Sequence, residues 1–320
     1  MDIDNLLPFR GFCALVIMMH HFSASAEPKY LLGIFTHIGY LFVAVFFFIS
    51  GYGVTCGYQK NNSYISLKSF VPKRFMNTVL PYWLCVLFTA VLIMIFFPPL
   101  NGMDFIKSFV SPNGIVHNAW YVAAVLIMYA GFILIFKIKN TGIALAVMFI
   151  YVTGFIVAML MLKESIWARS TFAFYLGIVY SFYKEKFDSF FKKNYFIKLS
   201  LFLIAFAGTC VLRYLFVLKN NFYAENIFAI AGSSLFAIIV FGFILKKVKV
   251  NNPILRFSGK ISYEIYLMHG FFCSELYMLN KNILLYYLII ISCTFVSSFI
   301  IFKAHLAINH FLNRKRKNAE

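Results

Sequence analysis

The chain has 320 residues, of which 62% are hydrophobic, 20% aromatic and only 12% charged. Soluble globular proteins carry about 25% charged residues, so this composition excludes a soluble domain, a disordered chain and a secreted disulfide-rich protein. The formal net charge of +18 requires no nucleic-acid partner, because basic loops of membrane proteins face anionic lipid at the cytoplasmic surface. The composition therefore predicts an integral membrane protein.

The N-terminal segment MDIDNLLPFR lacks the basic region and the cleavage site of a signal peptide, so we expect the first apolar segment to be retained. The six cysteines lie singly in apolar segments, without CxxC spacing. We interpret them as small hydrophobic residues. They are Cys13, Cys56, Cys85, Cys210, Cys273 and Cys293.

A membrane-spanning helix needs about 20 mostly apolar residues. Without an internal repeat, the chain is predicted to be one all-α bundle of ten transmembrane helices over residues 1–312, followed by a basic cytoplasmic tail at 313–320. Its polar breaks separate ten apolar segments, at about residues 6–24, 35–58, 79–99, 119–137, 141–162, 169–184, 196–218, 226–246, 259–280 and 283–309.

Basic residues are distributed unevenly between alternate loops. One set of loops, together with the C-terminal tail, carries 20 Lys and Arg residues, and the other set carries six. Positive charge concentrates in cytoplasmic loops, so both termini are predicted to be cytoplasmic in a multi-pass protein of the cell membrane. The six residues expected outside are Lys29, Lys107, Lys163, Arg169, Lys219 and Lys281.

The first apolar segment contains two ionisable residues at a regular helical spacing. Arg10 and His21 are eleven residues apart, close to three helical turns, so they share a face and lie about 16 Å apart along the axis. Ionisable groups at membrane depth are costly and are functional candidates. The alternative is that Arg10 extends to the cytoplasmic interface and His21 makes one hydrogen bond between helices.

Four segments, in this order, resemble the bacterial membrane acyltransferase 3 family. They are the Arg10–His21 pair with ten residues between them, GYLFVAVFFFISGY ending at Tyr52, KRFMNTVLPYW starting at Lys73, and GKISYEIYLMH ending at His269. The resemblance covers almost the whole chain. Enzymes of this family move acyl groups, usually acetyl, from cytoplasmic acyl-CoA to extracytoplasmic glycans or other envelope molecules.

The resemblance implies an O-acyltransferase with His21 and Arg10 as catalytic residues. Acetyl-CoA, or another acyl-CoA, would be the donor substrate, with no permanently bound cofactor, and a hydroxyl of an envelope glycan would be the acceptor. An unperturbed imidazole has a pKa near 6.5 and can take a proton from a hydroxyl group. It can also attack a thioester and carry the acyl group. The sequence leaves both routes open.

Donor-binding residues are expected at the cytoplasmic side. Lys73 and Arg74 offer phosphate ligands for coenzyme A, although they also fit the general basic character of cytoplasmic loops. Gly51 could admit the pantetheine arm or allow close packing of a neighbouring helix. The complete expected donor set is Lys73, Arg74, Ser50, Gly51, Tyr52 and Tyr82.

On the outer side, Trp120, Tyr121 and His117 are candidates for the acceptor entrance, and the alternative is that the aromatic pair anchors the chain at the membrane interface. Glu275, expected at outer depth, is a candidate to orient His21 or His269. No metal site is expected, because the seven histidines are scattered and a metal needs converging ligands. The supporting residues expected in the ninth segment are Tyr263, Glu264, His269 and Glu275.

A transporter or flippase of a polysaccharide precursor is the rival interpretation, since ten helices with basic inner loops suit many carriers. Transporters often contain internal repeats with paired broken helices, and none is visible here. The acceptor, the acyl chain and the oligomeric state are not indicated by the sequence.

Overall fold

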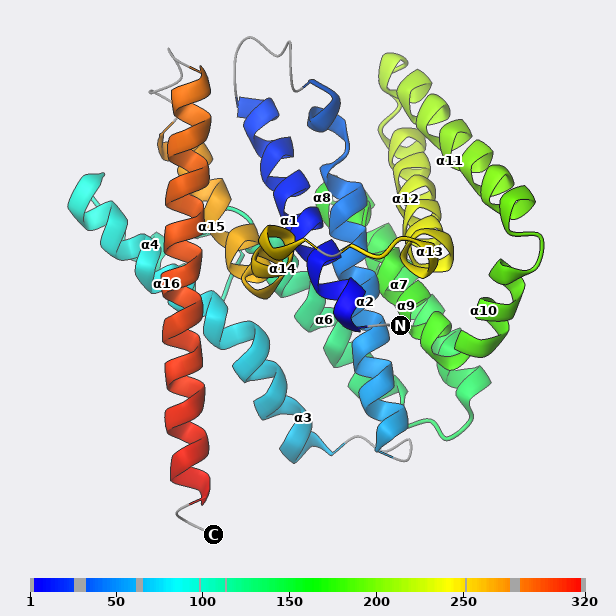
Figure 1. The fold of residues 1–320 in the computed structure, drawn as a ribbon, viewed down its shortest axis with the longest axis horizontal. Coiled ribbons are helices and arrows are strands. Elements are labelled where there is room, and N and C mark those ends of the chain that lie inside the picture. The colour runs from blue at the N-terminus through cyan, green and yellow to red at the C-terminus, as the bar shows by residue number, and fades with distance from the viewer. Residues whose placement is uncertain are drawn as a thin grey trace. The chain divides into compact units, whose positions relative to one another are not determined.

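The computed structural model describes residues 3–25, 33–61, 66–97, 99–112, 114–250, 252–276 and 283–317, and every regular element in these ranges is a helix (Figure 1). The predicted all-α class is therefore confirmed. The chain divides into two compact units. Unit 1 comprises residues 1–6, 38–65 and 124–251, and unit 2 comprises residues 7–37, 66–123 and 252–320.

Unit 1 is built on three helices that pack against one another, α2 (Gly39–Lys60), α9 (Phe172–Phe182) and α12 (Phe222–Ile239). Around these lie α6 (Trp120–Ile135, whose first turn belongs to unit 2), α7 (Thr141–Met161), α8 (Ser165–Ala168), α10 (Lys184–Lys192), α11 (Tyr195–Leu218), the π-helical turn η3 (Val240–Ile244) and α13 (Leu245–Lys247).

Two glycines allow the backbones of α2 and α9 to come into contact. Gly51 faces the backbone of Phe174, and Gly177 faces the backbone of Phe48 and Tyr52, so that a Cβ atom at either glycine would overlap these atoms. Small residues at helix interfaces permit such close approach within membranes. The small size of Gly51 is therefore used in packing α2 against α9, which is the helix-packing alternative for this residue.

An ion-pair network joins three segments of unit 1. Arg169, in the turn before α9, places Nη2 2.8 Å from Glu225 Oε1 and donates from Nε to Asn226 Oδ1 at 2.6 Å. Arg213 of α11 lies 3.4 Å from the same Glu225 oxygen. The predicted span at 226–246 leaves Glu225 outside, but α12 begins at Phe222. Glu225 is thus an acidic residue within a membrane helix that the sequence analysis missed.

Unit 2 contains the rest of α1 (Ile3–Ser25) and the mutually packed helices α4 (Leu80–Phe96), α15 (Ser262–Glu275) and α16 (Ile283–Lys317). Helix α1 approaches α14 closely, because Gly11 faces the backbone of Leu255 and Gly259 faces the backbone of Leu7. The other elements of the unit are η1 (Gly33–His37), α3 (Leu67–Arg74), the π-helical turn η2 (Phe75–Val79), α5 (Gly102–Lys107) and α14 (Pro253–Lys260).

Seven helical segments within the described ranges are long and apolar enough to cross a membrane: Leu6–Ala24, Gly39–Lys60, Leu67–Phe96, Thr141–Met161, Tyr195–Leu218, Phe222–Lys247 and Leu284–Leu312. The other three predicted spans correspond to the shorter helices α6, α9 and α15, of 16, 11 and 14 residues. The count of ten crossings and the cytoplasmic termini stay predictions. Lys29, Lys281 and residues 318–320 lie outside the described residues.

Two segments extend further than the hydropathy pattern predicted. The third span starts at Leu67 rather than near residue 79, so Lys73 and Arg74 lie inside the helix (Figure 1). Helix α16 has 35 residues and a length of about 52 Å, well beyond the ~30 Å hydrocarbon core. Residues 313–317 of the predicted tail continue this helix.

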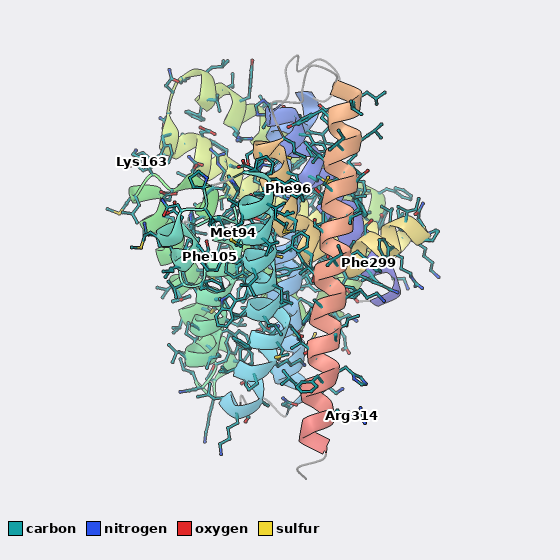
Figure 2. The ribbon with its side chains drawn as sticks, turned by 90° about the vertical axis from the view of Figure 1, so that its left-hand side faces the viewer. Met94, Phe96, Phe105, Lys163, Phe299 and Arg314 are labelled. Atoms are coloured by element: carbon teal, nitrogen blue, oxygen red, sulfur yellow. The ribbon has the colours of Figure 1, made fainter. Side chains whose placement is uncertain are left out.

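Large apolar side chains cover much of the protein surface. Met94 and Phe96 on α4 are 56% and 65% exposed, and Phe299 on α16 is 39% exposed (Figure 2). Helix α11 buries none of its 24 residues. Proteins in water rarely expose apolar patches of this extent, so these helix faces are suited to lipid contact.

Candidate active site

The imidazole of His21 packs against two other imidazoles in unit 2. Its ring centroid lies 4.9 Å from that of His20 and 4.9 Å from that of His269 on α15. The His21 side chain is partly accessible, whereas His269 is fully buried. Within the described part of the chain, His21 makes no hydrogen bond.

The ring of His269 is held on both nitrogens. Its Nδ1 lies 2.8 Å from the carbonyl oxygen of Ile265, and its Nε2 lies 3.1 Å from Nδ2 of Asn118. A carbonyl can only accept, so Nδ1 carries the proton and Nε2 accepts from the Asn118 amide. This arrangement assigns His269 the neutral Nδ1–H tautomer and leaves neither nitrogen free for chemistry. His269 is thus placed to orient His21.

A glycine makes the contact between Asn118 and His269 possible. A Cβ atom on Gly270 would lie 2.8 Å from Asn118 Nδ2 and 3.2 Å from His117 Cβ. The Asn118 amide also donates to the carbonyl of Tyr266 at 3.2 Å, which fixes its own orientation. His117 is exposed and lies 3.3 Å from Ser274 Oγ through its Nε2 atom.

A series of aromatic rings adjoins His269. Tyr266 lies 6.0 Å from His269, Tyr121 lies 5.3 Å from Tyr266, and Trp120 lies 6.4 Å from Tyr121, all between ring centroids. Trp120 and Tyr121 are only 9% and 7% exposed. Their burial favours a role inside the protein over anchoring among lipid headgroups.

Arg10 contacts α15, the helix that His21 also contacts. Its Nη2 atom donates to Ser262 Oγ at 3.2 Å, and Ser262 is the first residue of α15. Two turns further along α15, His269 contacts His21. Arg10 and His21 thus both contact α15, which agrees with the shared helix face that their spacing predicted. Glu264, beside Ser262 on α15, is only 3% exposed.

Lys73 and Arg74 are the last two residues of α3, and the π-helical turn η2 begins immediately after Arg74. Lys73 is exposed, and the guanidinium carbon of Arg74 lies 5.1 Å from the ring centroid of Phe70. Tyr82, by contrast, is buried, and its hydroxyl donates to the carbonyl of Ser108 in the segment between α5 and α6. This hydrogen bond holds the segment against α4, which is a structural role for Tyr82 that needs no contact with the acyl donor.

Ser50, Gly51 and Tyr52 belong to unit 1. Gly51 packs against α9 as described, and the Tyr52 ring lies 6.0 Å from that of Tyr180. His21, His269, Trp120, Tyr121 and Arg10 all belong to unit 2.

The residue that sequence reasoning missed is Asn118. Glu275 was expected to orient a histidine, but it makes no hydrogen bond or ion pair in the described ranges, whereas Asn118 holds His269. Asn118 stands two residues before Trp120, in the segment NAWYV, and the sequence analysis used only the aromatic pair of that segment. Among the described residues, no group of three His, Cys, Asp or Glu side chains could hold a metal ion.

Long apolar helices with lipid-compatible faces, and a partly accessible histidine positioned by a second histidine, define a polytopic membrane protein with an enzyme-like site. The acyltransferase 3 profile, described as an acyltransferase domain, matches residues 8–303, and the chain belongs to this family. No curated protein and no solved structure matches it. The chain is therefore a membrane acyltransferase, as its resemblance to the family predicted.

Proposed function

We propose that the protein transfers an acyl group, acetyl in the usual case, from cytoplasmic acyl-CoA to a hydroxyl of an envelope glycan on the outer side of the cell membrane. The observation that carries this proposal is the environment of His21. Its ring is partly accessible and free of hydrogen bonds within the described residues, and it rests on a histidine whose tautomer is fixed.

Two routes are compatible with this environment. As a general base, His21 takes the proton of the acceptor hydroxyl while the oxygen attacks the thioester carbonyl, and the departing coenzyme A thiolate receives the proton. As a nucleophile, His21 attacks the thioester carbonyl, the C–S bond breaks, and coenzyme A leaves as its thiol with the imidazole proton. The acceptor hydroxyl then attacks the acyl-imidazole, and its proton returns to the ring as His21 leaves. Brief incubation with acetyl-CoA followed by intact-protein mass spectrometry separates them, because only the second route adds an acetyl group to His21.

The other candidate residues are assigned to the donor or to the acceptor side. Arg10 near the first residue of α15 would align the donor arm, and Lys73 and Arg74 would bind the coenzyme A phosphates. Trp120 and Tyr121 would form the wall of the acceptor side, near His117.

The direct test is mass spectrometry of envelope glycans from cells with the wild-type protein, without it, and with His21→Ala. We expect an acetyl or other acyl mass on one glycan that disappears in the second and third samples. Identical glycans in all three samples would refute the proposal.

A further inference from the structure

The long helix Leu67–Phe96 contains a defect that its sequence explains. Its segments α3, η2 and α4 form one continuous 30-residue helix (Figure 1). In η2 the amide of Leu80 donates to the carbonyl of Phe75, five residues back, which is a π-helical bond. The next bond in this register would join residue 81 to Met76. Residue 81 is a proline and has no N–H to donate.

Two side chains from other helices of unit 2 bind the carbonyls of this turn. His305 Nε2, from α16, lies 2.8 Å from the Met76 oxygen and 2.8 Å from the side-chain amide of Asn309. A carbonyl can only accept, so Nε2 carries the proton and donates to Met76, and the Asn309 amide turns its oxygen toward the ring. The Tyr263 hydroxyl, from α15, donates to the Thr78 oxygen at 2.7 Å. A backbone carbonyl at membrane depth needs a partner, because lipid supplies none. His305 thus supplies the donor that Pro81 lacks.

The turn begins immediately after Arg74. An α-helix advances by about 100° per residue, so the wider π-helical turn rotates everything before it relative to α4. Local π-helical turns also bend helices. The state of this turn therefore determines where Lys73 and Arg74 are directed.

We propose that His305 and Tyr263 are positioning residues for donor binding. By bonding the carbonyls of Met76 and Thr78 they hold the π-helical turn, and the turn holds Arg74 in the orientation that binds phosphate. This inference rests on the proposed function, in which Lys73 and Arg74 bind the phosphates of coenzyme A. Neither His305 nor Tyr263 touches the donor in this arrangement.

Equilibrium binding of acetyl-CoA to the full chain in nanodiscs tests the proposal. We expect Arg74→Ala and His305→Leu each to weaken binding about five- to tenfold. The double variant should bind no more weakly than Arg74→Ala alone, because His305 acts only through Arg74. His305→Gln retains an N–H at a similar reach and should restore most of the affinity.

Two further variants separate positioning from a general loss of structure. His310→Leu changes an exposed histidine on the same helix and should bind as the wild type does. Pro81→Ala restores an N–H at residue 81, so His305→Leu should weaken binding less in that background. If His305→Leu does not fold, Tyr263→Phe replaces it, with the same expected non-additivity toward Arg74→Ala.

The outcomes are distinguishable. If Arg74→Ala weakens binding but His305→Leu and Tyr263→Phe do not, or if their effects add fully to that of Arg74→Ala, the positioning role is refuted while the donor site stands. If Arg74→Ala binds acetyl-CoA like the wild type, the donor assignment of Arg74 fails, and the positioning role fails with it.

Discussion

Two adjacent histidines of α1 differ in what their rings can do. His20 Nδ1 lies 2.8 Å from the carbonyl oxygen of Phe35, so this nitrogen carries the ring proton, and the hydrogen bond that it donates anchors the ring. His21 has no hydrogen bond in the described ranges and contacts His269. The proposed function therefore uses His21 for the chemistry and His20 as an anchor.

Substitution of each histidine by alanine tests this division. Because general acid–base catalysis contributes about 10²- to 10⁴-fold, His21→Ala should lower acyl transfer by at least 10²-fold while donor affinity is retained. His20→Ala should lower it by less than about tenfold. Transfer rates and acetyl-CoA affinities of the purified variants give the answer, and equal small losses of rate would contradict the assignment.

Asn118 should control turnover through His269. Asn118→Ala removes the N–H that His269 Nε2 accepts and leaves a buried nitrogen unpaired. We expect kcat to fall about tenfold with little change in acetyl-CoA affinity, because the donor groups are untouched. Ser274→Ala is the control: it removes an exposed hydroxyl from α15, the helix that carries His269, and should leave kcat unchanged. Wild-type turnover by Asn118→Ala would exclude a role for this contact.

The sequence could predict one part of the site and not the other. The spacing of Arg10 and His21 depends only on helical geometry, and both residues indeed face α15. The contact between Asn118 and His269 joins residues 151 positions apart. Periodicity carries no information about such a contact, and an asparagine before a helix is more often a cap.

Among the elements, α2 and α9 offer a matched pair of glycines. Gly51 faces the α9 backbone, whereas nothing lies within 4 Å of a Cβ atom built on Gly53, two residues along the same helix. Gly51→Ala should therefore destabilise the protein by about 1–3 kcal/mol through overpacking. Gly53→Ala should be neutral or slightly stabilising, because alanine favours helix more than glycine does. Thermal unfolding in detergent measures both, and equal midpoints would contradict the packing.

The bounds of the third span show why hydropathy alone does not predict where a membrane helix begins. Lys68, Lys73 and Arg74 lower the hydropathy of the third span, and Pro72 and Pro81 suggest breaks, yet the helix runs from Leu67 to Phe96. Charged side chains near a helix end extend to the interface, and a π-helical turn accommodates Pro81. Hydrogen bonds from side chains of α15 and α16 stabilise that turn. The hydropathy and the proline positions of the segment itself do not reveal these partners.

In unit 1, Asp188 of α10 links α9 to α13. Its Oδ1 atom lies 2.5 Å from Lys246 Nζ and accepts the Tyr180 hydroxyl at 2.8 Å. Partial burial alone would raise the pKa of Asp188, but the hydrogen bonds from Lys246 and Tyr180, with the charges of Lys246 and Lys184, lower it below its usual 3.8. A carboxylate whose pKa is lowered by folding stabilises the folded state at a pH above its unfolded-state pKa. This contribution is lost as the pH falls through the folded-state pKa.

Asp188→Asn should therefore reduce the thermal midpoint modestly near neutral pH, since the pair is partly exposed. The gap between wild type and variant should close as the pH falls below about 4. Midpoints recorded across this range decide the matter. A gap that widens in acid would show that the carboxylate is not the source of the stabilisation.

For the whole molecule, the central claim is that donor and acceptor meet at His21 from opposite sides of the membrane. In the proposed function, coenzyme A stays on the side of the basic loops, because it carries several phosphate charges and does not cross hydrocarbon. Arg10 lies about 16 Å along α1 from His21. Only the pantetheine arm therefore needs to enter the protein, and the acceptor hydroxyl arrives from the outer side.

Oriented proteoliposomes test this claim most directly. Labelled acetyl-CoA is supplied to one face and an envelope glycan extract to the other, and labelled glycan is measured for the wild type, Arg10→Lys and His21→Ala. We predict transfer only when acetyl-CoA is on the face of the C-terminal tail, weakened donor affinity in Arg10→Lys because the planar guanidinium is lost, and no transfer by His21→Ala. Equal transfer with acetyl-CoA on either face, or undiminished transfer by His21→Ala, would contradict the account.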